Sequence, residues 1–511
     1  MLKRMLLTMI AAITLVGGAT AQDSAGSILL VPFTDNSYGI TGVVPSSWTQ
    51  YSAGLWLREE PPQTLLAQQG IVGDFNEIVG ALLDQLGISE LPQPDGTVSA
   101  NGLDWAVYSI EGPAGTNILV DFALTTQGAS VYIVILQADA SERDALREAV
   151  FIPAVNALTP IEVVAVVPDD AGYTAENVTF NSGVIPLSGT LTLPTQEGPH
   201  PAIILISGSG AQDRDETLAG IQFAPFALIA DHLTRAGIAV LRYDDRGYGR
   251  SGGDYASATI EDFADDAEAA LTYLLTRPEI DATRIGVLGH SEGGVVAANM
   301  VEAGAPVAFY VLMAGPAVNG ADLLAEQNRR LYAAEGQTEE AAESQIAFIT
   351  EMFPLILNGD SLGVSLLLDS RIREQLASLT EEQLAQIGDV EAFIEQTVRG
   401  QLTDFSRPWW PYFLRYDPAE AWVTVSVPVL AVFGELDTQV DADQNATALQ
   451  TALEASPASS SFEIVTLDGA NHLFQLAATG GVSEYAVLQP RFIDAFLPTI
   501  TEWILEQTAQ P

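Results

Sequence analysis

Residues 284–294 read Arg-Ile-Gly-Val-Leu-Gly-His-Ser-Glu-Gly-Gly, an apolar run that leads into a glycine-rich turn around Ser291. The run predicts a buried strand, and the apolar residues that follow Gly293 predict a helix. The segment between them fits Gly-x-Ser-x-Gly, a sharp turn that exposes a serine between a strand and a helix. Gly289 and Gly293 leave space where the backbone folds so tightly. We therefore predict that Ser291 is a nucleophile.

The chain on both sides of this turn alternates between strand-like and helix-like segments. Strands are expected at 177–180, 189–193, 202–207, 238–243, 284–289, 308–313, 427–433 and 461–467. Helices are expected at 223–236, 260–276, 293–303 and 490–507. Such alternation predicts an α/β fold with a mostly parallel sheet that is covered on both faces.

Residues 317–422 interrupt this alternation. The segment is rich in Glu and Gln, and its apolar spacing predicts helices at 321–335, 339–353 and 381–401. It ends in an aromatic cluster formed by Trp409, Trp410, Tyr412, Phe413 and Tyr416. A helical insertion between two strands is expected to form a lid, whose aromatic side chains either fill a core or line an acyl pocket.

A serine hydroxyl needs a base before it can attack at neutral pH, and the chain has four histidines. His200 precedes a predicted strand, His232 lies on a predicted helix, and His290 is inside the turn itself. His472 follows the last predicted strand and comes after both the serine and the candidate acids, which is the order expected for this type of sheet. We therefore predict His472 as the base.

The base needs a carboxylate that orients its imidazole and stabilises the imidazolium. Asp437 is the predicted acid because Gly434-Glu-Leu-Asp437 directly follows a predicted strand. Glu435 is the alternative, and Asp441 is a more distant one.

An oxyanion hole needs two backbone N–H groups. The N–H of Glu292, directly after the nucleophile, is predicted as one of them. The loop Gly208-Ser-Gly210 should supply the other, with Ser209 as the first choice and Gly210 as the second. A dinucleotide-binding loop is disfavoured because Asp213 stands where the last glycine of that motif is required.

Composition excludes several functions. With 20 Lys and Arg against 66 Asp and Glu, the formal net charge is −46, so the surface should repel nucleic acid. The absence of Cys excludes disulfides, thiolate nucleophiles and Cys-bound zinc. The acidity itself fits either a means of staying soluble or an adaptation to a saline exterior.

The first residues predict export. Lys3 and Arg4 precede an apolar run at 5–16 and the small residues Ala19-Thr-Ala21, as in a signal peptide at 1–21 that is cleaved before Gln22. A retained membrane anchor is the alternative. No other stretch is long and apolar enough to span a membrane, so we expect a secreted or periplasmic protein without a membrane span.

Residues 22–168 predict a small α+β domain. Strands are expected at 39–44, 103–110, 118–125 and 130–137, with a helix at 64–86 and another that is capped by Ser141. The segment weakly resembles the small domains of photosystem extrinsic proteins and related bacterial secreted proteins, which implies binding or scaffolding. A linker is expected at 168–173.

Two further motifs accompany the serine turn. Residues 205–216 read Leu-Ile-Ser-Gly-Ser-Gly-Ala-Gln-Asp-Arg-Asp-Glu, and residues 241–252 read Leu-Arg-Tyr-Asp-Asp-Arg-Gly-Tyr-Gly-Arg-Ser-Gly. Taken with the turn, they resemble bacterial α/β-hydrolase esterases related to the prolyl-oligopeptidase-like and acyl-transferring hydrolases. The resemblance covers about 175–505, and 408–418 is similar to the end of the lid in that group. Within these motifs we expect 212–215 to be an ion-paired loop, with a lining of the site as the alternative, and 245–247 to be a structural turn.

The resemblance implies an α/β-hydrolase domain at 174–511 with a lid at 317–422, activity on short acyl esters, and no metal or organic cofactor. The sequence thus predicts an exported carboxylesterase with a Ser291, His472 and Asp437 triad and an acyl-enzyme intermediate. A peptidase or amidase with the same triad, and a non-enzymatic protein that binds through its first domain, remain the alternatives.

Overall fold

The computed structural model describes residues 28–509, apart from gaps at 36–37, 53, 59–63, 73–74, 87, 89, 113–116, 128–129, 162–171, 219–222, 378, 381–383, 385–386, 388–389, 458–460 and 486. The predicted signal peptide and most of the predicted linker therefore lie outside the described residues. The described residues form two domains, a carboxyl-terminal domain from residue 172 and an amino-terminal domain before residue 162.

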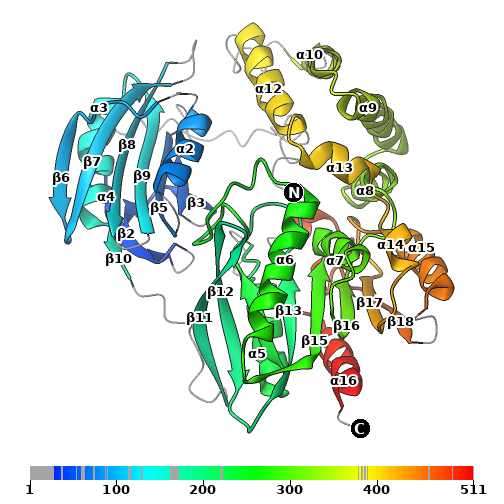
Figure 1. The fold of residues 1–511 in the computed structure, drawn as a ribbon. Coiled ribbons are helices and arrows are strands. Elements are labelled where there is room, and N and C mark those ends of the chain that lie inside the picture. Colours follow the sequence, from blue (N-terminus) through cyan, green and yellow to red (C-terminus); the bar gives the residue numbers. More distant parts are fainter. Residues whose placement is uncertain are drawn as a thin grey trace.

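The carboxyl-terminal domain is built on an eight-stranded sheet in the order β11-β12-β14-β13-β15-β16-β17-β18 (Figure 1). β12 is antiparallel to both of its neighbours, and from β14 to β18 each strand runs parallel to the next. The strands are β11 (Tyr173–Ser182), β12 (Ile185–Pro194), β13 (His200–Ile206), β14 (Ala239–Tyr243), β15 (Ile280–His290), β16 (Phe309–Met313), β17 (Val429–Gly434) and β18 (Phe462–Leu467). The predicted α/β fold with a mostly parallel sheet is confirmed.

Helices cover both faces of this sheet. Every residue of β16 and β17 is buried, as expected for parallel strands between two helical layers. Across the sheet, the chain moves from β13 to β14 in one direction and from β14 to β15 and β16 in the other. Right-handed crossovers therefore place α5 on one face of the sheet and α6 and α7 on the other. α16 packs against α5. The helices are α5 (Pro225–Arg235), α6 (Ile260–Leu275), α7 (Glu292–Glu302), α15 (Ala442–Ala455) and α16 (Phe496–Thr508), with a short 3-10 turn η3 (Val482–Glu484).

The last helix starts later than predicted, at Phe496 rather than near 490. Phe492 instead turns inward, where its ring lies 5.3 Å from Phe223 and 4.6 Å from Phe496 between ring centroids. Packing of this aromatic side chain fixes an irregular backbone that helical periodicity alone did not reveal.

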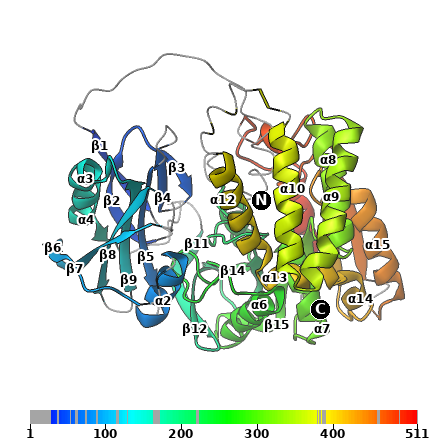
Figure 2. The ribbon, with the colours of Figure 1, turned by 90° about the horizontal axis from the view of Figure 1, so that it is seen from above.

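A helical insertion separates β16 from β17. Its described helices are α8 (Gly320–Ala334), α9 (Glu339–Leu357), α10 (Ser361–Ala377), α12 (Val390–Phe405), α13 (Trp409–Arg415) and α14 (Pro418–Trp422). Figure 2 shows α8, α9 and α10 side by side on the opposite side of the molecule from the amino-terminal domain. None of the described helices has both the length and the apolar character needed to cross a bilayer.

The amino-terminal domain contains a seven-stranded antiparallel sheet in the order β3-β4-β5-β9-β8-β7-β6, beside a three-stranded sheet of β1, β2 and β10. The strands are β1 (Leu30–Asp35), β2 (Ile40–Pro45), β3 (Thr49–Ser52), β4 (Leu55–Arg58), β5 (Thr64–Val72), β6 (Gly96–Ala100), β7 (Leu103–Glu111), β8 (Ile118–Gln127), β9 (Ser130–Asp139) and β10 (Thr159–Pro160). The helices are α2 (Phe75–Leu86), α3 (Arg143–Leu146), the π-helix η2 (Arg147–Phe151) and α4 (Ile152–Ala157). This is the small α+β domain that the sequence predicts.

Alternation along the strands gives this sheet two buried faces. Trp105 and Ala123 face a core shared with α4, whereas Phe122 and Ile133 face a second core shared with α2. Successive residues of a strand point to opposite faces, so one sheet separates the two cores.

The predicted helix at 64–86 is wrong in its first half. Residues 64–72 form β5, which pairs with both β4 and β9, and only residues 75–86 form a helix. Pairing on both sides overrides the helical spacing of the apolar residues. Gly70 allows the close pairing of β5 with β9, because a Cβ at this position would lie 2.7 Å from the Tyr132 ring of β9.

The predicted cap of the following helix is also wrong. Ser141 hydrogen-bonds to the Asp139 carboxylate, and the helix begins at Arg143 after Glu142, whose side chain makes no capping bond. The Ser141 hydroxyl is therefore bonded to the Asp139 carboxylate and does not cap the helix.

The two domains meet near the loop that follows β14. The ring of Tyr38 lies 6.0 Å from that of Tyr248, and Tyr38 is buried.

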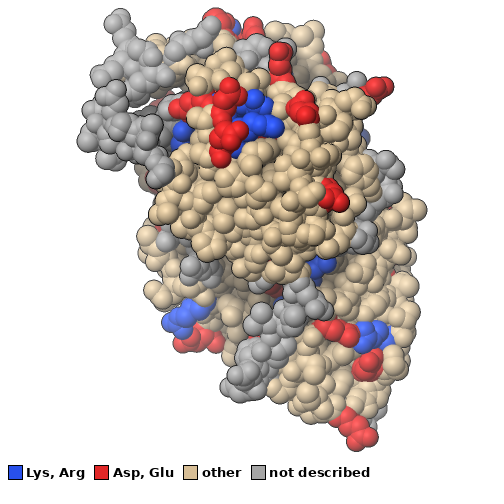
Figure 3. Space-filling view, turned by 90° about the vertical axis from the view of Figure 1, so that its left-hand side faces the viewer, with Lys and Arg blue, Asp and Glu red and all other residues tan. Residues whose placement is uncertain are grey.

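On the side of the molecule seen in Figure 3, Lys and Arg side chains lie beside Asp and Glu, and a broad uncharged surface separates the charged groups.

Candidate active site

The predicted turn lies between β15 and α7. Ser291 has φ 52° and ψ −119°, a backbone conformation that few residues other than glycine adopt. Its N–H donates to the carbonyl of Met313 at 2.9 Å, and its carbonyl accepts from Gly294 N–H at 2.8 Å. Such strain costs about 1–3 kcal/mol and persists only where the surrounding structure enforces it.

Two glycines allow this turn because the backbone passes so close to itself. A Cβ on Gly289 would lie 2.1 Å from the carbonyl oxygen of Gly293, and one on Gly293 would lie 2.3 Å from that of Ile206 in β13. No side chain fits at either position, as the sequence indicated.

His472 and Asp437 meet beyond the ends of β18 and β17. His472 Nδ1 lies 2.8 Å from Asp437 Oδ2, and both side chains are buried. The other oxygen, Oδ1, accepts from the N–H groups of Gln439 and Val440 at 2.8 and 2.9 Å. The carboxylate is thus fixed by the backbone and can orient the imidazole.

The two alternative acids have other partners. Glu435 Oε2 accepts from Gly469 N–H at 2.8 Å. Asp441 caps α15 through Gln444 N–H at 2.8 Å and pairs with Arg330 at 2.7 Å. Of the three carboxylates, the structure joins Asp437 to His472.

His472 also lies beside the serine turn. Its ring centroid is 4.9 Å from that of His290, the residue before Ser291. Among the described residues, no hydrogen bond joins Ser291 Oγ to the His472 imidazole. Such bonds commonly tighten only once substrate is bound.

The loop after β13 faces the same serine. A Cβ on Gly208 would lie 3.2 Å from Ser291 Cβ. Gly208 N–H donates to Glu216 Oε1, and Gly210 N–H donates to the Tyr255 hydroxyl, each at 2.9 Å. Within the described part of the chain, the N–H groups of Ser209 and Glu292 have no acceptor. These are the two donors that the sequence predicted for an oxyanion hole.

Several known proteins are similar in sequence to this chain. The family described as serine aminopeptidase, S33, matches residues 223–363. The chain is 26% identical over 342 residues to esterase EstD of Thermotoga maritima, which is 66% of this chain and 69% of that protein. It is 33% identical over 116 residues to the human mitochondrial acyl-coenzyme A thioesterase 2, covering 22% of this chain but only 20% of that protein.

Two solved structures of esterases are also similar to the chain. The chain is similar to a Pyrococcus furiosus esterase, with a TM-score of 0.41, 16% identity, and coverage of 68% of this chain and 96% of that one. It is also similar to a thermophilic esterase from Thermogutta terrifontis, with a TM-score of 0.36, 17% identity, and coverage of 65% and 99%.

The strand order and the position of the serine turn after the central strand β15 decide the fold. The protein has the α/β-hydrolase fold. The match to the family described as serine aminopeptidase, S33, is in keeping with a hydrolase.

In this α/β-hydrolase fold, Glu292 is a buried acid directly beside Ser291. The residue is 4% exposed, and its Oε2 accepts from the Ser209 hydroxyl and from the Trp409 indole N–H, both at 3.0 Å. Burial raises the pKa of Glu292 to about 7, although both hydrogen bonds oppose the shift. Its side chain therefore connects the oxyanion loop to the lid.

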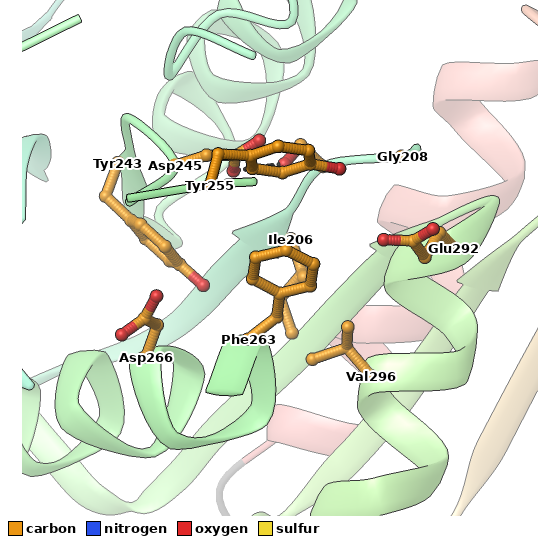
Figure 4. A pocket seen from close by; sticks show the side chains of 10 residues that line it. Ile206, Gly208, Tyr243, Asp245, Tyr255, Phe263, Asp266, Glu292 and Val296 are labelled. Atoms are coloured by element: carbon orange, nitrogen blue, oxygen red, sulfur yellow. Dashed lines mark hydrogen bonds between the residues drawn. The ribbon is translucent and has the colours of Figure 1, made fainter. Parts of the chain in front are cut away.

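Behind this loop lies a cavity of about 20 Å³, room for about one water molecule (Figure 4). It is lined by Glu292, Tyr255 and Asp245, among others. Asp245 accepts from the Ser207 hydroxyl and Gln212 N–H at 2.6 and 2.9 Å. Burial raises the pKa of Asp245 well above its usual range, despite these two bonds.

The lid aromatics pack within the insertion and bond to the helix that carries the serine turn. Phe413 is buried, and a Cβ on Gly320 of α8 would lie 2.6 Å from its ring, so it belongs to the core of the insertion. Trp409 stacks on Phe413 at 4.4 Å between ring centroids and reaches Glu292 through its indole N–H. Tyr412 hydrogen-bonds to Asn299 of α7. Helix α13 is therefore tied to the helix that carries the serine turn.

The charged motifs form ion pairs beneath the site. Arg214 binds the buried Asp244 carboxylate at 2.7 Å, and Arg246 binds Asp266 at 2.7 Å. Tyr248 N–H donates to the carbonyl of Asp245, closing the expected turn. The structural roles predicted for 212–215 and 245–247 agree with these contacts.

Sequence reasoning missed the contacts made by Glu216 and His290. Their side chains, 74 residues apart, lie 2.6 Å from each other beneath Ser291. The available signal was indirect: an acid closes the motif at 205–216, and a histidine precedes the serine.

Of the other histidines, His200 begins β13 and His232 lies on α5. Across the described residues, no three His, Asp or Glu side chains are grouped as metal ligands.

The raised pKa of Glu292 predicts a pH-dependent difference in stability between wild type and Glu292→Gln. The folded state holds this proton up to about pH 7, whereas the unfolded chain releases it near pH 4.3. Wild type should therefore lose roughly 4 kcal/mol of unfolding free energy relative to the variant as pH rises through this window. Denaturant unfolding from pH 4 to 8.5 measures the difference.

The matched control is Glu302→Gln, the same change at an exposed position of α7. Its unfolding free energy should follow that of wild type across the range. A constant difference between wild type and Glu292→Gln from pH 4 to 8.5 would contradict the buried, protonated carboxyl.

Proposed function

We propose that the protein is an exported serine hydrolase that cleaves carboxylic esters, with Ser291 as nucleophile, His472 as base and Asp437 as the orienting acid. The observation that carries the proposal is the 2.8 Å contact between His472 Nδ1 and Asp437 Oδ2 beside the strained serine turn. The N–H groups of Ser209 and Glu292 are proposed as the oxyanion hole.

In the first half of the reaction, His472 Nε2 removes the proton from the Ser291 hydroxyl as Oγ attacks the ester carbonyl carbon. The carbonyl oxygen becomes an oxyanion that accepts from the two free N–H groups. When the tetrahedral intermediate collapses, the C–O bond to the alcohol breaks, and His472 gives its proton to the leaving oxygen.

In the second half, His472 takes a proton from water as the water oxygen attacks the acyl-enzyme. The carboxylic acid product leaves when its bond to Ser291 Oγ breaks and His472 returns the proton to that oxygen. Asp437 remains ionised throughout and balances the charge of the transient imidazolium.

A peptidase or amidase with the same residues is the second candidate. The family description, serine aminopeptidase, favours it, whereas the longer similarity to the Thermotoga maritima esterase favours esters. Leaving-group preference distinguishes the two candidates, because they share one nucleophile and one base.

Ser291→Ala should lower kcat/KM for a p-nitrophenyl ester by about 10⁴-fold or more, because the covalent route is lost. The control is Ser370→Ala, on an exposed position of α10, which should match wild type. Initial rates are measured on p-nitrophenyl esters of graded acyl length and on the p-nitroanilide of each acyl group. Comparing the variants tests the nucleophile, and comparing ester with anilide gives the preference between ester and amide bonds.

Faster cleavage of the anilides would transfer the assignment to an amidase. No catalysis by wild type on any member of the panel would favour a binding protein over an enzyme, and an active Ser291→Ala variant would remove Ser291 from its proposed role.

Charge indicates which esters are suitable substrates. With a net charge of −46, the protein should repel polyanionic acyl carriers such as coenzyme A. The human relatives that act on acyl-coenzyme A match only about a fifth of this chain. We therefore propose uncharged esters as the substrate class.

At low ionic strength, kcat/KM for an acyl-coenzyme A should be well below that for an uncharged ester with the same acyl group. Raising NaCl from about 10 mM to about 0.5 M should increase the first value several-fold, because salt screens the repulsion, and leave the second nearly unchanged. Rates on the thioester that fall with salt would contradict this substrate class.

Export is proposed from the charged, apolar and small-residue segments at 3–21. Amino-terminal sequencing of the protein recovered from the periplasm or medium should begin at Gln22. Intact Met1 on membrane-associated protein would instead support the retained anchor.

A further inference from the structure

Glu216 and His290 form a buried pair beneath the serine turn that the mechanism above does not use. Glu216 is 1% exposed and His290 is 3% exposed. Glu216 Oε1 lies 2.6 Å from His290 Nδ1. A buried acid paired with a buried histidine, next to a nucleophile, needs a physical reason because removing both from water is costly.

The contacts of His290 determine its charge. Nδ1 faces the Glu216 carboxylate, and Nε2 lies 3.2 Å from the carbonyl oxygen of His472. Both neighbours are acceptors, so the imidazole satisfies both only when each nitrogen carries a proton. Burial opposes this charged form, but the Glu216 carboxylate outweighs it, and the pKa of His290 is raised. The other titratable groups that face this imidazole are His472 and, behind it, Asp437.

Glu216 reaches the oxyanion loop from the other side. The same Oε1 accepts from Gly208 N–H at 2.9 Å. Gly208 lies against Ser291 and precedes Ser209, whose N–H is the proposed oxyanion donor. Fixing the N–H of Gly208 limits the rotation of the next peptide group, which carries the Ser209 N–H.

The backbone at Glu216 is itself strained to allow this contact. Its φ is 54°, unusual for a residue other than glycine. Asp213 holds the turn, because its Oδ1 accepts from the N–H groups of Asp215 and Thr217 at 3.1 and 2.9 Å. Strain of this kind persists where the neighbouring structure enforces one conformation, commonly at functional sites.

We propose that Glu216 and His290 are positioning residues for ester hydrolysis. Through three hydrogen bonds, the pair fixes the oxyanion loop and the backbone of His472 relative to the serine turn. The proposal rests on the function assigned above to Ser291, His472 and Asp437. Three loops from β13, β15 and β18 are thus held by one ionised pair at the centre of the site.

Glu216→Gln tests the pair with little change in shape. A neutral glutamine cannot preserve all three bonds around a neutral His290. If its oxygen accepts from Gly208 and His290 Nδ1, then Nε2 has no proton for the His472 carbonyl. If its nitrogen faces them instead, the bond from Gly208 is lost. We expect kcat to fall about 10- to 100-fold, as for a modest misplacement of reacting groups, with KM within about threefold of wild type.

The control for a merely structural role is Asp121→Asn. Asp121 is a buried carboxylate paired with Arg143 and Arg147 in the amino-terminal domain. Its loss should lower the free energy of unfolding, as breaking a buried ion pair does, while kcat stays at the wild-type value. Equal effects of the two substitutions on both stability and kcat would overturn the positioning role.

Nitrogen-15 NMR of the imidazoles provides a readout that stability does not affect. The chain has four histidines, so few signals overlap. At pH 6, below the ordinary histidine pKa of about 6.5, His290 should have both nitrogens protonated in wild type and should be neutral in Glu216→Gln, where burial is no longer offset by a carboxylate. A neutral His290 in wild type at pH 6 would overturn the proposal even if Glu216→Gln does not fold.

A double substitution gives the last test. Glu216→Gln with His290→Phe should be no slower than His290→Phe alone, because both changes break the same chain of bonds. Fully additive losses, or a Glu216→Gln variant with wild-type kcat and a neutral His290, would refute the positioning role while leaving the hydrolase assignment intact. Failure of that assignment shows separately, as an active Ser291→Ala variant or as inactive wild type.

Discussion

The active-site edge of the sheet depends on one close approach, that of the start of α7 to the end of β13. Gly293 lies so near the carbonyl of Ile206 that no side chain fits between them, and Gly289 is equally close to Gly293. This contact forces Ser291 into its strained conformation and leaves the Glu292 N–H directed outward at the start of a helix. Because β13 and β15 are parallel neighbours, the oxyanion loop begins at the same edge. The loops that carry Asp437 and His472 follow β17 and β18, which end at that edge as well.

Buried acids surround this edge, and each has a distinct environment. Asp437 is held by backbone N–H groups and faces His472, an arrangement that can orient the imidazole. Burial raises the pKa of Glu292 to about 7, although the Ser209 hydroxyl and the Trp409 indole N–H donate to its carboxyl group. In the proposed reaction, protonation of Glu292 below about pH 7 removes a negative charge from beside the developing oxyanion, which a carboxylate at this position would oppose. The lid contributes through Trp409, so its position and the state of this acid are physically linked.

How much the sequence could predict follows from how local each signal is. The serine turn, the alternation of strands and helices, and the order of Ser291, Asp437 and His472 along the chain are local or ordered features, and the corresponding elements are found where expected. The strand at 64–72 was missed because its pairing with β4 and β9 is non-local and overrides helical spacing. The contact between Glu216 and His290, like that between Trp409 and Glu292, joins residues far apart in the chain. Sequence patterns alone do not determine such contacts, since they arise only when loops from different strands converge.

The most direct test of the account is a crystal structure of the protein inactivated by a fluorophosphonate. We expect phosphorus bonded to Ser291 Oγ, with the phosphoryl oxygen accepting hydrogen bonds from the N–H groups of Ser209 and Glu292, and His472 Nε2 within hydrogen-bonding distance of the adduct. An adduct on another residue, or a phosphoryl oxygen turned away from both N–H groups, would contradict the proposed site.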